Sequence, residues 1–92
     1  MELNLDQIRK EIDAADHQLV EIFCKRMDLV KQVAGYKIAN DMQVLHPDRE
    51  KIILDKVEEE AGSVYGAYTR ELYVEIMRLS RQMQQKLIDG VK

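Results

Sequence analysis

The chain has 92 residues, of which 46% are hydrophobic and 34% are charged, and its formal net charge is −3. This length and composition predict one folded domain, residues 1–92, and exclude a disordered chain. The negative charge argues against nucleic acid or an acidic membrane surface as a partner, and no apolar run approaches the roughly 20 residues of a membrane span.

The N-terminal residues MELNLDQIRKEID show no signal-peptide pattern, so we expect a cytoplasmic protein. One proline and four glycines are too few for the turns of a many-stranded β fold. Cys24 has no partner for an internal disulfide, and we expect it to be a small, buried or half-buried hydrophobic residue. Because His17 and His46 lie far apart in the sequence, no metal-ligand cluster is visible, and no cofactor is expected.

The first predicted helix runs from about residue 5 to residue 40. Asn4 is positioned to cap its N-terminus, and the pair Asn40-Asp41 ends it. Apolar residues recur along this helix at heptad spacing, which is typical of a face buried against a partner. This apolar seam consists of Leu5, Ile8, Ile12, Ala15, Leu19, Ile22, Leu29 and Val33.

Arg26 occupies a seam position where the heptad spacing calls for an apolar residue. Lys37 follows eleven residues later, which is about three helical turns, so it lies on the same face. Two cations on a buried face are costly unless an anionic group compensates them. The pattern therefore predicts that the chain encloses a small anion.

A second, short helix is predicted over residues 48–61, because Pro47 suits a first helical turn and apolar residues follow it. We expect Gly62 to end this helix and Ser63 to cap the next one. The third helix, of medium length, is predicted over residues 64–89, where an apolar stripe recurs. The stripe consists of Leu72, Ile76, Leu79, Met83 and Leu87. The predicted fold class is all-α, with three helices per chain, of which the first is very long.

The first predicted helix is too long for a compact chain of this size. About 36 residues at about 1.5 Å each give a rod of about 54 Å, whereas a compact monomer has a radius of gyration of about 12 Å. A protruding helix would expose its leucine and isoleucine side chains, which promotes aggregation. We therefore expect an intertwined helical homodimer. The alternative is a first helix that breaks at Gly35 and folds back into a bundle.

Some polar residues keep two interpretations on spacing alone. Arg9 lies 17 residues, about 25 Å, before Arg26, so it is either a solvated arginine or a group that approaches Arg26 of a partner chain. Ser80 and Gln84 share one helix face at i, i+4. A solvated face is the simpler interpretation of this pair, and a partly buried set of uncharged donors is the alternative.

Arg49 and Glu50 open the second predicted helix. Glu50 suits the positive end of the helix dipole, and ordinary surface charge accounts for both residues. Arg49 is less expected at that end, and a nearby anion would favour it there. Several cations, an amide, a hydroxyl and one carboxylate together suit a small dicarboxylate whose charge shifts during a reaction.

These residues, in this order and at these separations, resemble the all-helical chorismate mutases. The resemblance covers nearly the whole chain and rests on LDQIRKEIDAADHQLVEIFCKRMDLVKQVAGYK at residues 5–37, DRE at 48–50 and IMRLSRQMQQ at 76–85. It implies an isomerase that converts chorismate to prephenate by a Claisen rearrangement, in phenylalanine and tyrosine biosynthesis, without a metal or cofactor.

The resemblance also implies which side chains bind the substrate carboxylates. Arg26 would bind them together with Arg9 from the partner subunit of the homodimer. Arg49 would supply a further cation at the same end of the site. Ser80 would line the pocket and contact a carboxylate or the ring.

The remaining implied roles concern the ether oxygen and the ring hydroxyl. Lys37 and Gln84 would donate hydrogen bonds to the ether oxygen, and Glu50 would accept one from the ring hydroxyl. With Arg26, these three are the implied catalytic residues. His46 departs from the resemblance, since many members have an acidic residue there. It could still bind the hydroxyl, although an exposed histidine before Pro47 is the simpler interpretation.

Two other functions remain as alternatives. An isochorismate pyruvate lyase of the same fold would share the arginines and the lysine, but Glu50 and Ser80 match the mutase pattern. A non-catalytic helical dimerisation module would need only the apolar seam.

Overall fold

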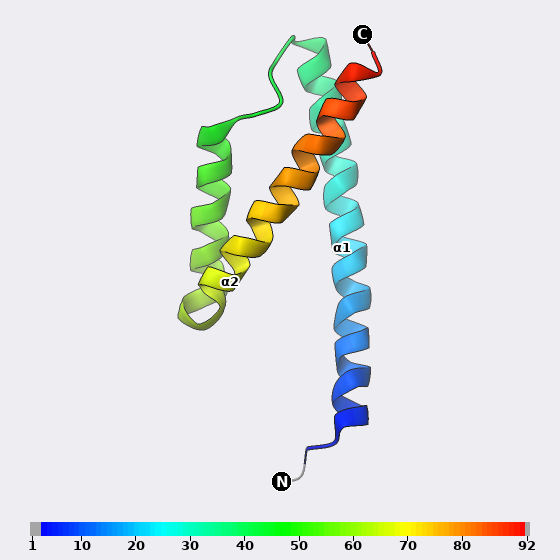
Figure 1. Cartoon of the computed structure of the whole chain (residues 1–92), viewed down its shortest axis with the longest axis vertical. Coiled ribbons are helices and arrows are strands. Elements are labelled where there is room, and N and C mark those ends of the chain that lie inside the picture. The colour runs from blue at the N-terminus through cyan, green and yellow to red at the C-terminus, as the bar shows by residue number, and fades with distance from the viewer. Residues whose placement is uncertain (1–2, 92) are drawn as a thin grey trace.

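The computed structural model describes residues 3–91, which form two α-helices joined by a short loop (Figure 1). Helix α1 spans Leu5–Ala39, and helix α2 spans Pro47–Asp89. The prediction of an all-α fold is confirmed. The prediction of three helices is wrong, because the second and third predicted helices form the single element α2. Neither helix has a stretch long and apolar enough to cross a membrane.

Helix α1 begins and ends where nearby side chains satisfy its free backbone groups. The side chain of Asn4 accepts a hydrogen bond of 3.1 Å from the backbone N–H of Gln7, which confirms the predicted N-cap. At the other end, Asn40 donates to the carbonyl of Tyr36 from its backbone N–H and its side chain. Asp41 then has a φ of 53°, which a right-handed helix does not continue through. The helix runs unbroken between these caps, so the alternative of a broken first helix is wrong.

Helix α2 bends at Gly62 into a first arm, residues 47–61, and a second arm, residues 63–89. Gly62 has a φ of 84° and a ψ of −179°, a conformation that residues with a Cβ atom rarely adopt. This single residue turns the chain back on itself, as the lower end of α2 in Figure 1 shows. Because no loop separates the arms, the two predicted helices merge.

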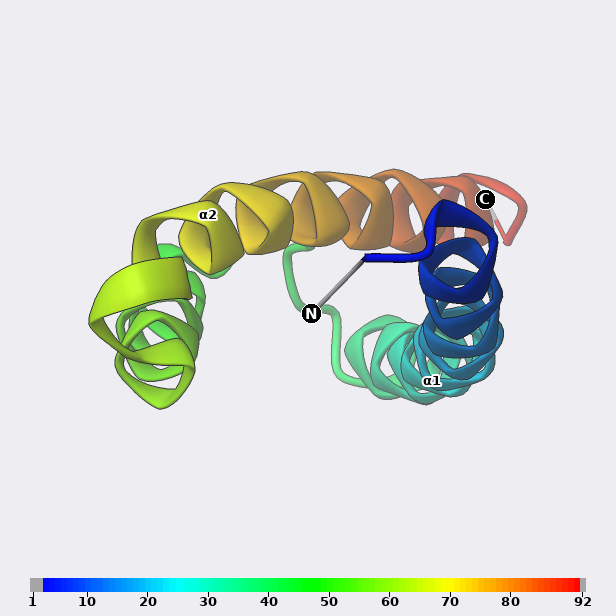
Figure 2. The ribbon, with the colours of Figure 1, turned by 90° about the horizontal axis from the view of Figure 1, so that it is seen from below.

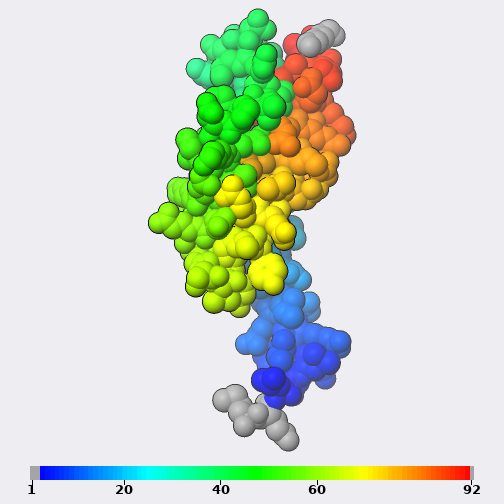
Figure 3. Space-filling model, turned by 60° about the vertical axis from the view of Figure 1, so that its left-hand side comes forward, coloured from blue at the N-terminus to red at the C-terminus, as the bar shows by residue number. Residues whose placement is uncertain are grey.

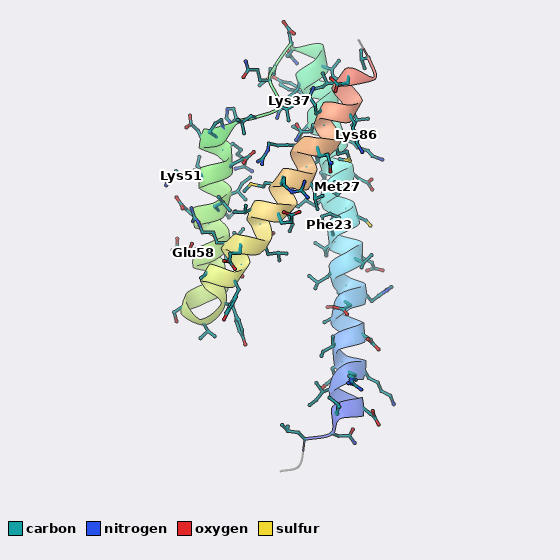
Figure 4. All side chains as sticks on the ribbon, viewed as in Figure 1. Phe23, Met27, Lys37, Lys51, Glu58 and Lys86 are labelled. Atoms are coloured by element: carbon teal, nitrogen blue, oxygen red, sulfur yellow. The ribbon has the colours of Figure 1, made fainter. Side chains whose placement is uncertain are left out.

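The second arm of α2 connects the other two segments. Seen along the long axis of the molecule, α1 and the first arm lie on the same side of the second arm (Figure 2). Phe23 and Met27 of α1 lie beside Leu79 and Met83 of the second arm. Figure 4 labels Phe23 and Met27 where α1 approaches this arm. The second arm therefore bridges α1 and the first arm, which lie on one side of it.

The two arms of α2 come close together beside the bend. A Cβ atom added at Gly66 would lie 2.8 Å from the backbone oxygen of Glu58. Arg70 of the second arm donates hydrogen bonds to Asp55 at 2.9 Å and to Glu58 at 3.1 Å, both on the first arm. Gly66 thus allows the two arms to approach closely, and Arg70 holds them together through two carboxylates of the first arm.

The chain on its own is extended and has almost no hydrophobic core. Its radius of gyration is 16.9 Å and its principal extents are 59 × 26 × 14 Å. Within residues 3–91, the buried hydrophobic side chains are those of Ala34 and Met77. The N-terminal half of α1 projects beyond the rest of the molecule (Figure 3). Its large apolar side chains are more than half exposed: Leu5, Ile12, Leu19, Val20 and Ile22.

We expect Gly66→Ala to lower the free energy of unfolding by about 1–3 kcal/mol, because the new methyl group would collide with the carbonyl of Glu58. Gly35→Ala is the matched control. No atom lies within 4 Å of a Cβ atom at that position, so the higher helix propensity of alanine should stabilise α1 by up to about 1 kcal/mol. Urea and thermal unfolding measure both changes. Equal stability of the two variants would contradict the close approach of the arms.

Candidate active site

A cavity of about 280 Å³ lies between α1, the loop and both arms of α2. Its apolar walls are formed by Leu29, Val30, Val33, Val44, Ile53 and Met77. The cavity also brings together every predicted site residue except Arg9: Arg26, Lys37, His46, Arg49, Glu50, Ser80 and Gln84. Arg81, which the sequence analysis did not single out, completes the polar lining.

Helical periodicity explains how distant residues reach one cavity. The α1 residues on its wall recur at three- and four-residue intervals, so they share one face of the helix: Arg26, Leu29, Val30, Val33 and Lys37. The same intervals relate the residues of the second arm: Met77, Ser80, Arg81 and Gln84. The first arm contributes its first two turns, which begin at Pro47 as the sequence predicted within one residue.

Lys37 is the most tightly held polar side chain of the cavity. Only 9% of its surface is exposed. Its Nζ donates a hydrogen bond of 2.9 Å to Oε1 of Gln84 and one of 2.8 Å to the backbone oxygen of Val44. Lys37 is labelled in Figure 4. Burial lowers the pKa of Lys37 below its usual value of 10.5, and the nearby carboxylate of Glu50 opposes this shift. An ammonium has three N–H donors, so one remains for a ligand.

Gln84 is buried as well, which corrects the expectation of a solvated face for Ser80 and Gln84. Because Oε1 of Gln84 accepts from Lys37, the amide nitrogen of Gln84 keeps two N–H donors for other partners. Burial follows from the packing of the second arm against α1, which spacing within one helix could not reveal. Lys37 and Gln84 thus form a pair of hydrogen-bond donors at one end of the cavity.

Arg26 is held from the second arm through two contacts. Its Nη1 donates a hydrogen bond of 3.1 Å to Oγ of Ser80, and its guanidinium carbon lies 5.7 Å from the ring centroid of Tyr73. The hydroxyl of Ser80 in turn donates to the backbone oxygen of Ile76 at 2.8 Å. The arginine that interrupts the apolar seam is therefore partly buried and oriented.

Glu50 lies in the first turn of α2 and forms an ion pair with Arg81 of the second arm. Both side chains are mostly buried, with 22% exposed for Glu50 and 32% for Arg81. The sequence contained a signal for Arg81, because it lies four residues after Met77 and three before Gln84. These intervals place it beside the helix face that Ser80 and Gln84 share. Arg49 and His46 lie at the rim of the cavity and are exposed, as the simpler interpretation of His46 predicted.

The lining of the cavity carries more positive than negative charge. Arg26, Lys37, Arg49 and Arg81 are the cations, and Glu50 is the carboxylate. Such an excess of guanidinium and ammonium groups over a largely apolar wall suits an anion that has two or more carboxylates and an apolar body. Among the residues described, no group of three or more His, Cys, Asp and Glu side chains is arranged to hold a metal ion.

Two residues discussed in the sequence analysis, Arg9 and Cys24, lie away from the cavity. Arg9 is exposed on the projecting half of α1, about 25 Å along the helix axis from Arg26. Cys24 is exposed, so the expectation of a buried or half-buried cysteine is wrong for the single chain. The second arm packs against the face of α1 that carries Phe23 and Met27, and it leaves Cys24 uncovered.

Comparison with known proteins agrees with this arrangement. The family model for chorismate mutase type II matches residues 8–85. The chain is 31% identical to the T-protein of Haemophilus influenzae over 78 residues, which is 83% of this chain and 21% of that protein. It is also 31% identical to a bifunctional chorismate mutase/prephenate dehydratase of Aquifex aeolicus over 75 residues, which is 80% of this chain and 21% of that protein.

A chorismate mutase of Methanocaldococcus jannaschii is 36% identical over 53 residues, which is 58% of this chain and 54% of that protein. The chain thus spans about a fifth of the length of the first two relatives and about half of the third. No solved structure gives a significant match. Because the family model covers most of its length, including the residues that line the cavity on all three segments, the chain belongs to the chorismate mutase type II family.

Proposed function

We propose that this chain converts chorismate to prephenate, the step that supplies phenylalanine and tyrosine biosynthesis. The observation that carries the proposal is the cavity in which Lys37 and Gln84, paired at 2.9 Å, face a lining with an excess of cations. Membership of the chorismate mutase type II family supports the same substrate. Chorismate carries one carboxylate on its ring and a second on its enolpyruvyl side chain, and a lining with several cations suits such a dicarboxylate.

The reaction is an intramolecular rearrangement, and it explains the kinds of side chain in the cavity. The C–O bond of the ether breaks while a C–C bond forms between the enolpyruvyl group and the ring. No proton has to move and no covalent enzyme intermediate is needed. The protein lowers the barrier by holding the reactive conformer and by stabilising negative charge that develops on the ether oxygen.

Lys37 and Gln84 are the donors proposed for the ether oxygen. Lys37 keeps one N–H and Gln84 keeps two after their mutual hydrogen bond, so both can donate to one oxygen atom between them. They are fixed before the substrate binds, and preorganised donors avoid the cost of reorientation during the reaction.

The other lining residues are proposed to bind the rest of the substrate. Arg26 binds a carboxylate, since its guanidinium is oriented by Ser80 and Tyr73 yet keeps free N–H donors. Arg49 adds positive charge at the rim. Glu50 accepts a hydrogen bond from the ring hydroxyl, and His46, which lies at the rim just before the first arm, can contact that hydroxyl as well.

A second copy of this chain is proposed to complete the site. The apolar side chains on the projecting half of α1 are exposed, and Arg9 lies among them. An intertwined antiparallel dimer would cover these side chains and bring Arg9 of one chain near Arg26 of the other. Arg9 then binds a substrate carboxylate from across the interface.

The proposal is tested by following the disappearance of chorismate and the formation of prephenate with the unmodified chain. We expect turnover, and we expect Gln84→Leu to lower kcat by about 10²–10³-fold because one donor to the ether oxygen is lost. Gln85→Leu is the matched control, since its side chain is exposed and bonds to Asp89, and it should keep normal activity. Pyruvate release from isochorismate without any prephenate from chorismate would refute the mutase and favour the lyase.

The fall of kcat/KM at alkaline pH should reflect the loss of the proton from the Lys37 ammonium. The ammonium must be charged to donate, and burial lowers its pKa, so activity should fall as the pH rises through this lowered pKa. Glu50→Gln removes the carboxylate that raises the pKa of Lys37, so the alkaline fall of the residual activity should move to lower pH. Glu75→Gln, which removes an exposed carboxylate of the second arm, should leave the profile unchanged. An alkaline limb that does not move in Glu50→Gln would contradict the assignment to Lys37.

Mixing two inactive variants tests the shared site. We expect Arg9→Ala and Arg26→Leu each to lose activity, since each removes a guanidinium from every site. A mixed dimer would hold one site with both arginines intact, so an equimolar mixture that has exchanged subunits should regain about one quarter of the normal activity. No recovery after exchange, verified by mass spectrometry of the mixed dimers, would contradict a site built from two chains.

A further inference from the structure

Arg81 is one of the cations that line the cavity, but the function proposed above gives it no individual role. Its Nη1 donates to Oε1 of Glu50, across the space between the two arms of α2. The two residues are 31 positions apart in the sequence, so this is not a contact between neighbouring turns of one helix. It joins the second arm to the very start of the first arm, the part farthest from the bend at Gly62.

This ion pair differs from the surface pairs on the same helix. Arg78 and Glu75 pair within the second arm at i, i+3, with exposed fractions of 51% and 55%. Glu50 and Arg81 are less than a third exposed, at 22% and 32%. Charges that are partly removed from water interact more strongly, and a carboxylate left without its partner there is destabilised. A contact of this kind restrains the orientation of Glu50.

Glu50 needs such a restraint because other cations compete for it. Arg49 is its neighbour in the chain, and the charge of Glu50 also acts on Lys37, whose pKa it raises. A carboxylate that turned to Lys37 would occupy the N–H that the proposed mechanism reserves for the ether oxygen. The contact with Arg81 involves Oε1, which leaves Oε2 of Glu50 available to accept a hydrogen bond.

We propose that Arg81 is a positioning residue that holds Glu50 by one carboxylate oxygen, so that the other oxygen accepts the hydrogen bond of the ring hydroxyl. This inference rests on the proposed function, since it assigns Arg81 a role in binding the same substrate. Arg81 acts through Glu50, whereas Arg26 and Arg49 attract the substrate carboxylates directly.

Three variants of the full chain test the proposal on chorismate. Arg81→Met removes the charge while it keeps a long, flexible side chain, and we expect it to lower kcat/KM by about tenfold or more, the cost of a lost charge-assisted hydrogen bond. Arg81→Lys should recover most of the loss, because the contact uses one guanidinium nitrogen that an ammonium can replace. Arg78→Met is the control, because it breaks the exposed pair with Glu75 and should leave kcat/KM within about twofold of normal.

The decisive measurement repeats Arg81→Met in the Glu50→Gln background. If Arg81 acts through Glu50, Arg81→Met should add little to the loss of kcat/KM that Glu50→Gln already causes. If Arg81 instead contacts the substrate independently, the two losses should multiply. Multiplying losses, no loss in Arg81→Met, or no recovery in Arg81→Lys would overturn the proposal.

Two controls distinguish a failure of the role proposed for Arg81 from a failure of the proposed function and from a loss of folding stability. Thermal unfolding of Arg81→Met and Arg78→Met is compared, and a loss of activity that follows a lower Tm in both would overturn the positioning role. If the unmodified chain does not convert chorismate, the proposed function fails together with this inference. If the unmodified chain is active and Arg81→Met equals Arg78→Met, the inference about Arg81 alone fails.

Discussion

The burial of one ammonium group, that of Lys37, constrains the rest of the molecule. A buried charge needs hydrogen-bond partners, and Lys37 has two of them, the backbone oxygen of Val44 in the loop and Gln84 on the second arm of α2. These two hydrogen bonds fix the loop over the end of the cavity and set the position of the second arm along α1. The bend at Gly62 then returns the first arm to face the same cavity. The nitrogen atom of one side chain on α1 thus joins the loop to the second arm.

The same hydrogen bonds determine what the cavity can do. Lys37 and Gln84 use one another as partners and still keep donors free, so they can meet a developing negative charge without rearranging. Arg26 is fixed in a similar way by Ser80 and Tyr73. In each case a side chain that would be mobile on a surface is restrained by a contact from another helix. The catalytic chemistry proposed for the chain depends on this restraint more than on any reactive group.

Much of the fold followed from local rules, and the errors about burial share one physical cause. The N-cap at Asn4, the helix start at Pro47 and the turn at Gly62 are set by residues within a few positions, so spacing and residue type identified them. The exposure of Cys24 and the burial of Gln84 depend on how one helix packs against another. Periodicity within a helix does not report which neighbour covers which face. The pairing of Arg81 with Glu50 could not be predicted for the same reason, because the two residues lie on different arms.

In the proposed dimer, the projecting half of α1 would link assembly to ligand binding. An anion that contacts Arg26 of one chain and Arg9 of another would bind only to paired chains, and by mass action it would favour pairing. The exposed leucines and isoleucines of this half would then remain covered at chain concentrations too low for pairing without the ligand. For such a protein, substrate concentration would act on the amount of assembled enzyme as well as on the occupancy of its sites.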